Sequence, residues 1–552
     1  MGTTDLGTGR SSGWTRPAEA IAEATVHSEH SGMSRRQLLA GLSALGLGAA
    51  VTAACAPNPE WVPLGPGFPD MAEFPDGVIA GDPRPGGSTI WTRVAPPQPT
   101  SEVPVVWSVA NDAEFNSIVA GGVSSASAVS DFGTTVKVEG LAPDSWYHYR
   151  FEALGAVSRT GRLRTAPAPD SSPERLRFAF ASCQQLSAQF VAHRAIAAET
   201  DLDFLLHLGD YVYVNDELTL TRSDYRDSYQ RWRLQPELRD LHAKVPMVAM
   251  WDDGEFYNGI DSTGDPARLA AAMDGWFDSF PLVRPPDSNA YRLLSWGSLA
   301  DLPIIDVRRH RDPASDEIDY TSPGVPHDPT RTTLGAEQYA WLTSSLAGSA
   351  ATWRVIGNPY NIAPWKLVNL EWLRPFRPDM PPEAGIYAPN EAWDDYLRER
   401  RDLLSFLADN AITDTVFASA HTHMFITSEL SIDDRPGSGP VAVDFCSGSL
   451  TADPDVRTSY LGDLPLDAAE EVLGIAEQWV VANNAPGMRH FNMVEQGYTL
   501  VDLTTDEMLV THRLIDTHDP DAQARDGARF RVARGSSRIE VLPTPGAEGA
   551  FA

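Results

Sequence analysis

Two apolar runs in this chain end in side chains that can bind a metal ion. The run at residues 176–181 is followed by the thiol of Cys183, and the run at 204–208 by the carboxylate of Asp210 and the phenol of Tyr213. Both runs have the length of buried strands, and in open α/β sheets ligands bind outside the carboxyl ends of the strands. We therefore expect these three side chains to face one site.

A third apolar run, residues 245–251, ends in a turn of acidic side chains. Asp252, Asp253 and Glu255 lie on this turn, and the amide of Asn258 is close behind. Carboxylates on one tight turn repel one another unless something cationic lies among them. A solvated acidic loop is the alternative, but this turn follows a strand in the same way as the first two groups of ligands.

A fourth run, residues 414–420, ends in His421 and His423. Residues two apart on an extended segment point the same way, so both imidazoles can face one centre, or one can stand behind the other. Thiolate, phenolate and imidazole suit a transition ion, and the phenolate favours Fe(III), whereas Asp and Asn oxygens suit Ca(II), Mg(II) or Mn(II). Two ions that share one Asp, about 3.5–4 Å apart, are suited to phosphoryl transfer to water.

The four runs lie in a segment where strands alternate with helices. Residues 176–208 predict a βαβ unit, so Cys183 and Asp210 are expected at the ends of neighbouring parallel strands. The closing strands, residues 498–503 and 508–514, are expected to complete a second sheet. The predicted fold class is therefore α/β.

A different pattern precedes this segment. Residues 74–167 hold short alternating runs broken by Gly, Pro and Asp, which predict an antiparallel β-sandwich with a packing or interaction role. Within it, residues 141–150 resemble the Tyr-bearing strand of fibronectin type III-like domains. A Pro-rich linker at 56–73 precedes the sandwich, and residues 519–552 are left as an unassigned C-terminal tail.

The start of the chain predicts export. Twin arginines, Arg35 and Arg36, precede a short run rich in Gly and Ala that is too weakly apolar for a transmembrane helix. The run ends in Cys55, where the sequence resembles a lipobox, although an ordinary cleavage site with an incidental cysteine is the alternative. Residues 1–55 are therefore expected to be a disordered leader with a twin-arginine signal, and the protein a cell-surface lipoprotein or a secreted protein.

The charge and the cysteine content of the chain limit the classes of partner that we expect. The formal net charge is -32, and a surface of this sign repels polyanions at long range. Nucleic acid is therefore not expected as a main partner, and an anionic substrate must be attracted by a local positive centre such as a metal. The chain has 3 cysteines, too few for a disulfide-stapled exoprotein. We expect a monomer, attached to the cell envelope if Cys55 carries a lipid.

Several motifs resemble those of the PhoD-like alkaline phosphatases, which belong to the calcineurin-like metallophosphoesterase superfamily. The matching stretches are residues 180–184, 206–213, 251–255, 334–342, 393–400 and 497–498. They run in family order over residues 74–516. The resemblance implies a four-layer α/β/β/α metallophosphoesterase domain at residues 174–518, export by the twin-arginine route, an Fe(III) and Ca(II) cluster, and hydrolysis of phosphate esters.

The resemblance also implies residue roles at the first ion and at the substrate. Cys183, Asp210 and Tyr213 would bind Fe(III), and Asp210 would bridge to the second ion. His423 would correspond to the histidine that ends the family's Gly-Asp-x-His motif. Arg308 either helps to hold phosphate or is a structural residue paired with an Asp. The expected catalytic residues are Asp210, His423 and Arg308.

The second ion is where the chain departs from the family. Asp253 or its neighbour Asp252, together with Asn258, would bind this ion, with Ca(II) expected and Mn(II) or Mg(II) as alternatives. His421 replaces the family's Asp ligand, so a ligand is exchanged rather than lost. Gly254 replaces a histidine beside the leaving group, which matters less for a phenol-like leaving group than for an alkoxide.

Three functions remain open from the sequence. The first is an exported phosphatase in which two metal ions activate water for attack on a phosphate ester. The second is a phosphodiesterase in the same site, including one that acts on phospholipids or teichoic-acid-like polymers. The third is a non-catalytic metal-binding or surface-adhesion protein that keeps the fold.

Overall fold

The computed structural model of this chain describes residues 73–544, apart from 215–217, 389–391, 434–438 and 453–465. The predicted leader, the twin-arginine segment, Cys55 and nearly all of the linker lie outside these residues. Within the described part of the chain, no helix is both long enough and apolar enough to cross a membrane.

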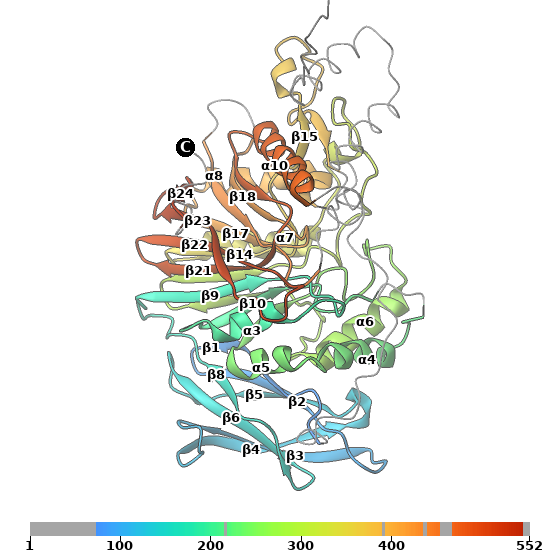
Figure 1. Ribbon diagram of the computed structural model, residues 1–552, viewed down its shortest axis with the longest axis vertical. Helices are drawn as coiled ribbons and strands as arrows, with labels where there is room; N and C mark the ends of the chain where they lie inside the picture. Colours follow the sequence, from blue (N-terminus) through green and yellow to red (C-terminus); the bar gives the residue numbers. More distant parts are fainter. Residues whose placement is uncertain (1–72, 215–217, 389–391, 434–438, 453–465, 545–552) are drawn as a thin grey trace, which may run out of the picture.

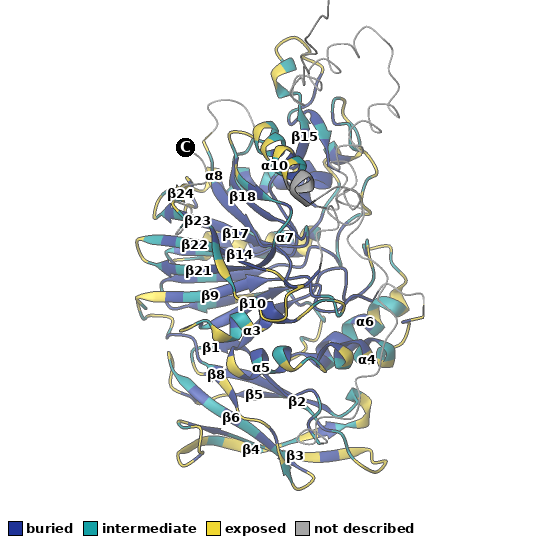
Figure 2. Cartoon of the chain, viewed as in Figure 1, coloured by how far each residue is buried: buried dark blue, intermediate teal, exposed yellow. Residues whose placement is uncertain are grey.

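The predicted antiparallel β-sandwich lies at one end of the molecule (Figure 1). Its smaller sheet has the strand order β1 (Val78–Arg84), β2 (Gly87–Arg93), β5 (Gly133–Val138). The larger sheet has the order β4 (Ile118–Ser127), β3 (Glu102–Ala110), β6 (Trp146–Ala153), β7 (Ala156–Val157), with β8 (Gly161–Arg164) also paired to β6. Apolar side chains from both sheets share one core, whereas much of β3 and β4 is exposed (Figure 2).

Two seven-stranded sheets form the rest of the fold. The first has the order β11 (Met247–Met250), β10 (Phe204–Leu208), β9 (Arg175–Ala181), β21 (Gln496–Thr504), β22 (Glu507–Ile515), β23 (Arg525–Ala533), β24 (Glu540–Leu542). The second has the order β12 (Arg292–Trp296), β13 (Ala300–Ile304), β14 (Trp353–Gly357), β17 (Thr415–Ser419), β19 (Ala442–Cys446), β18 (Phe425–Leu430), β20 (Met488–Asn492). One hydrophobic core contains side chains from both sheets.

The closing strands lie in a different sheet from the one that we expected. β21 pairs antiparallel with β9, so β21 and β22 extend the first sheet rather than complete the second. Their alternating pattern fits the face of either sheet, and only long-range pairing decides between them. The first sheet continues into the segment that the sequence left as a tail, where β23 and β24 follow.

Helices cover both sheets. Those that share a core with the first sheet are α3 (Val191–Ala198), α4 (Arg222–Trp232), α5 (Pro236–Lys244) and α6 (Pro266–Ser279). Those that pack on the second sheet are α7 (Gly335–Gly348), α8 (Leu397–Asp409) and α10 (Leu466–Asn483). A small hairpin, β15 (Lys366–Asn369) and β16 (Gly385–Tyr387), lies beside α10, and the short 3-10 helices are η2 (Ala128–Ser130), η3 (Val325–His327), η4 (Glu371–Leu373) and η5 (Trp393–Tyr396).

Two arginines, the half-buried Arg292 and the buried Arg233, join the β-sandwich to the first sheet. Arg292 donates to both carboxylate oxygens of Asp82 in β1 and to a main-chain carbonyl of β11, each at 2.8 Å. Arg233 lies 4.5 Å from the ring centroid of Trp91 in β2, and its Nε donates to the hydroxyl of Tyr211 at 3.2 Å. Tyr211 lies three residues after the end of β10, next to the candidate ligand Asp210. The contacts of Arg233 therefore attach the sandwich close to the strand ends that carry the candidate ligands.

Candidate metal centre

The candidate ligands lie where three strands of one sheet and one strand of the other come to an end. Four of them have a left-handed backbone, with φ of 63° at Cys183, 54° at Asp210, 73° at His421 and 59° at His423. Left-handed conformations are uncommon for residues other than glycine, and they concentrate at functional sites. Three of the four strands, β9, β10 and β17, are therefore followed by sharp turns at the residues that carry candidate ligands.

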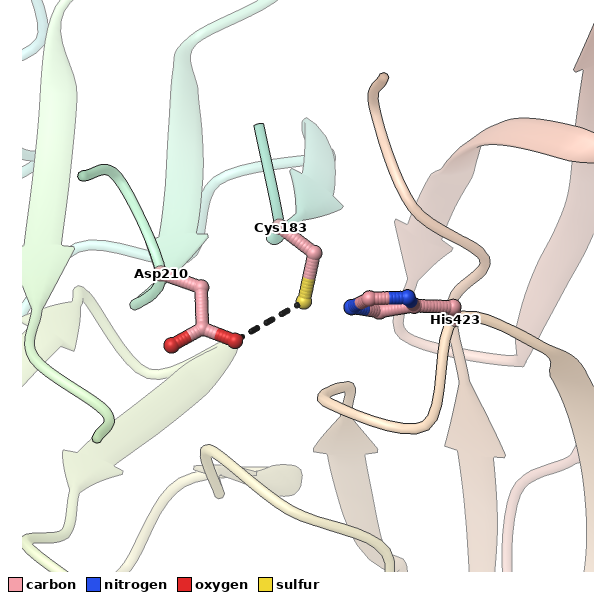
Figure 3. Close-up of side chains that lie close together, drawn as sticks. All are labelled: Cys183, Asp210 and His423. Atoms are coloured by element: carbon pink, nitrogen blue, oxygen red, sulfur yellow. Dashed lines mark hydrogen bonds between the residues drawn. The ribbon is translucent and has the colours of Figure 1, made fainter. Parts of the chain in front are cut away.

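One buried group combines a thiol, a carboxylate and an imidazole. The ligand atoms of Cys183, Asp210 and His423 all lie within 4.8 Å of one another. Figure 3 shows the three side chains converging, with the thiol of Cys183 donating to Oδ2 of Asp210 at 3.3 Å. The buried hydroxyl of Tyr213 lies 3.1 Å from Nε2 of His423. The structure thus brings together the mixed ligand set that the sequence predicted for a transition ion.

A second buried group shares Asp210 with the first. Its ligand atoms, from Asp210, Asp252, Asp253 and His421, also lie within 4.8 Å of one another. Oδ1 of Asp253 is buried and accepts no hydrogen bond. Nη2 of Arg308 and Nδ1 of His421 lie 3.8 Å and 3.9 Å from this oxygen, beyond hydrogen-bond distance. Because a buried carboxylate oxygen without a hydrogen bond is unfavourable, a further cation at this position is the expected compensation.

The protonation states of these side chains also indicate a place for cations. Burial raises the pKa of Asp253 to about 7 against the opposing effect of Arg308, and the neighbouring carboxylates of Asp210 and Asp252 add to the increase. Burial and Asp210 likewise raise the pKa of the Cys183 thiol well above its ordinary value. Burial opposes protonation of His421, but Asp252 raises its pKa to about 10. Bound cations would reverse these shifts by displacing the protons, so the residues fit a metal centre.

Arg308 is fully buried and paired with an Asp, as one of the two sequence interpretations expected. Its Nε and Nη2 both donate to Asp252, the latter at 3.0 Å, and Nη2 lies 3.1 Å from Nδ1 of His421. The guanidinium lies 4.9 Å from the ring centroid of Tyr360. This ion pair lowers the pKa of Asp252 despite its burial and engages both carboxylate oxygens, which leaves Asp253 as the freer carboxylate of the two. A contact between Arg308 and phosphate stays a prediction.

Asn258 is placed differently from the other predicted ligands. Its side chain is exposed, whereas the seven other candidates are buried. The main chain beside it still contributes, because the N–H of Gly259 donates to Oδ2 of Asp253 at 3.1 Å. Binding of the second ion by Asn258 therefore stays a prediction.

Two supporting side chains were not identified from the sequence. The hydroxyl of Ser182 lies 2.8 Å from the sulfur of Cys183, and the ring of Tyr360 packs on Arg308. Ser182 adjoins Cys183, so the motif itself could have signalled it. Tyr360 follows β14, more than 50 residues after Arg308 in the printed sequence, and no local pattern connects them.

Gly254 is enclosed by the metal-binding groups. A Cβ atom added there would lie 2.6 Å from the carbonyl oxygen of Val212 and 2.7 Å from Oδ1 of Asp210. The N–H of Gly254 already donates to that same Oδ1 at 2.9 Å. In this chain, Gly254 thus supports Asp210 through its main-chain N–H. A side chain at position 254 would displace Asp210 or the main chain of Val212.

Gly254→Ala is therefore expected to lower the free energy of unfolding by about 1–3 kcal/mol, as overpacking of a buried site does, and to reduce the bound metal. Urea denaturation and metal analysis measure the two effects. Gly86→Ala is the matched control, since a Cβ there meets nothing within 4 Å. A Gly254→His variant that folds normally and hydrolyses alkyl phosphates faster than the wild type would contradict this interpretation.

Comparisons with known proteins identify the family of this chain. Residues 178–512 match the family described as PhoD-like phosphatase, and residues 67–167 match its N-terminal domain family. Alkaline phosphatase D of Bacillus subtilis (strain 168) is 30% identical over 425 residues, which cover 70% of each chain. A solved structure described as "Structure of PhoD" superposes with a TM-score of 0.75 at 27% identity, covering 88% of this chain and 95% of that one.

Proposed function

Because the chain belongs to the PhoD-like phosphatase family and is a phosphoric-ester hydrolase, we propose that it hydrolyses its substrates with two metal ions held by the groups that share Asp210. The observation that carries the proposal is the presence of one buried carboxylate in both groups of candidate ligands. A carboxylate shared by two sites is the arrangement that holds paired ions at the spacing used in phosphoryl transfer.

The two groups differ in chemistry, which supports two different ions. Cys183, Tyr213 and His423, with Asp210, form a mixed group that suits a transition ion, and the phenolate of Tyr213 favours Fe(III). Asp253, with Asp210 and the exchanged ligand His421, forms the harder group and suits a divalent ion, with Ca(II) first and Mn(II) or Mg(II) as alternatives. When bound, such ions supply an activated water and neutralise the oxygens of the phosphate group.

The protein's own residues hold these groups in place. The N–H of Gly254 holds Oδ1 of Asp210 at 2.9 Å, and the hydroxyl oxygen of Tyr213 lies 3.1 Å from Nε2 of His423, close enough for both to face one ion. Arg308 neutralises Asp252, so that the net negative charge around the second ion is smaller than three carboxylates alone would give. With glycine at position 254, no side chain there can donate a proton to a leaving group.

We expect a phosphomonoester with a phenolic leaving group to be the best substrate class, because a phenolate leaves with little protonation. The test compares kcat/KM for an aryl phosphate, an alkyl phosphate and the matching aryl phosphodiester. A rate on the aryl monoester at least about 10-fold above the other two supports the proposal, given that general acid catalysis contributes about 10²–10⁴-fold where it operates. A faster diester reaction would instead assign the enzyme to the phosphodiesterases.

Export, domain division and layering complete the proposal. The twin-arginine segment and Cys55 support delivery to the cell surface, with a lipid anchor or as a secreted protein. Helices that pack on both seven-stranded sheets support a four-layer α/β/β/α catalytic domain over residues 174–518. The two-sheet core supports a fibronectin type III-like sandwich over residues 74–167.

A further inference from the structure

Glu255 lies two residues after Asp253, but its carboxylate is directed toward the main chain rather than toward the metal-binding groups. Oε2 accepts hydrogen bonds from the N–H groups of Asp210 and Asp252, both at 2.9 Å, and Oε1 accepts one from Tyr211 at 2.8 Å. Glu255 is only 1% exposed. One buried carboxylate therefore connects the residues that follow β10 with those that follow β11.

The backbone around Asp210 explains why an anion is needed there. Gly209 and Asp210 have φ of 94° and 54°, a left-handed pair that turns consecutive N–H groups toward one side. Consecutive N–H groups arranged in this way form a concave site for an anion. Without Glu255, three buried N–H groups would lose their acceptor, and the left-handed turn that directs Asp210 would lose its support.

We propose that Glu255 is a positioning residue that sets the separation of Asp210 from the Asp252–Asp253 turn, and through it the metal affinity of both groups. The inference rests on the proposed function in one respect, namely that these groups bind metal. Residues that hold ligands without touching the metal affect affinity because they fix ligand orientation before the ion arrives. Glu255 does so through the main chain of two strand ends at once.

Two substitutions distinguish the effect of the charge of Glu255 from the effect of its side-chain length. Glu255→Gln keeps the length but offers one acceptor oxygen, so at least one of the three hydrogen bonds is lost. Glu255→Asp keeps the charge but is shorter by one methylene and cannot span both strand ends. With Mn²⁺ as the probe on metal-stripped full-length protein, we expect the dissociation constant to rise by about 10- to 100-fold in Glu255→Gln and less in Glu255→Asp. Electron paramagnetic resonance of the free ion measures it.

Glu429→Gln is the matched control. Glu429 is also a buried carboxylate that accepts a main-chain hydrogen bond, from Ile539 at 2.9 Å, but it belongs to neither metal-binding group. The control should lose stability and keep its Mn²⁺ affinity, whereas a merely structural role for Glu255 predicts that the two Gln variants behave alike.

The Mn²⁺ affinities of the wild type and the variants distinguish a positioning role of Glu255 from a purely structural one. Unchanged Mn²⁺ affinity in Glu255→Gln, or an equal loss in Glu429→Gln, would overturn the inference and leave the metal centre standing. A wild-type protein that binds neither Mn²⁺ nor Ca²⁺ nor iron would overturn the proposed metal centre and this inference together. If Glu255→Gln does not fold, Glu255→Asp decides, since wild-type affinity in that variant is incompatible with a positioning role.

Discussion

Asp210→Asn is expected to lower kcat/KM on an aryl phosphate by more than about 100-fold and to reduce the metal content of both sites. Residues that only support a ligand change metal affinity or activity by about 10- to 100-fold, and Asp210 belongs to both groups of candidate ligands. The amide keeps the shape of the side chain but removes the charge that the two ions would share. Steady-state kinetics and metal analysis of the same preparations measure the two losses.

The control for this variant lies at the opposite end of the same strand. Asp203 precedes β10 and accepts a hydrogen bond from the N–H of Arg177 at 3.0 Å, remote from the strand end that carries Asp210. Asp203→Asn should therefore lose some stability but stay within a few-fold of wild-type activity. If Asp210→Asn retained wild-type turnover, the shared carboxylate could not be part of the reaction.

Local patterns in the sequence identified most of what the site contains. Each predicted ligand group follows an apolar run, and the structure makes strands of these runs: β9, β10, β11 and β17. Such runs are reliable because a buried parallel strand must be apolar on both faces. The position of the ligands also follows from topology, since carboxyl ends of parallel strands share one edge of a sheet.

Long-range pairing could not be predicted in the same way. β21 carries an apolar pattern that fits either sheet, and its partner β9 lies more than 300 residues earlier in the printed sequence. Within the predicted sandwich, β4 has the weakest strand pattern, because Ile118–Ser127 consists largely of Ser, Ala and Gly and lacks the apolar–polar alternation of a half-buried strand.

The pairing of side chains within the site could not be predicted from the sequence either. The choice between Asp252 and Asp253 as the freer carboxylate depends on Arg308, which a different strand delivers. The direction of Glu255 depends on left-handed turns at Gly209 and Asp210. Glycine and aspartate tolerate this conformation, but propensity alone does not say which of the many aspartates adopts it. These contacts are properties of the folded chain, and they decide how an ordinary acidic turn becomes a binding site.

Tyr213→Phe is expected to abolish a visible absorption band in the protein exported by its native route and to lower kcat by about 10- to 100-fold. The proposed band arises from charge transfer between a phenolate and Fe(III), so it requires the oxygen of this residue. That oxygen lies 3.1 Å from Nε2 of His423, and His423 belongs to the group that also contains Cys183. Absorption spectra with iron analysis on wild type and variant measure the effect directly.

Tyr211→Phe is the control, because it removes the hydroxyl oxygen of a neighbouring tyrosine. It distinguishes loss of a ligand as the cause of a lost band from general destabilisation of the fold. The hydroxyl of Tyr211 accepts a hydrogen bond from Arg233 at 3.2 Å, on the side toward the β-sandwich, and burial raises its pKa to about 12. Loss of this buried hydrogen bond should destabilise the fold by about 1–3 kcal/mol but leave the band intact. A band that survives in Tyr213→Phe would assign the colour to another ligand, and a colourless, iron-free wild type would exclude iron. An ion without a phenolate band would then have to occupy the group of Cys183, Asp210 and His423.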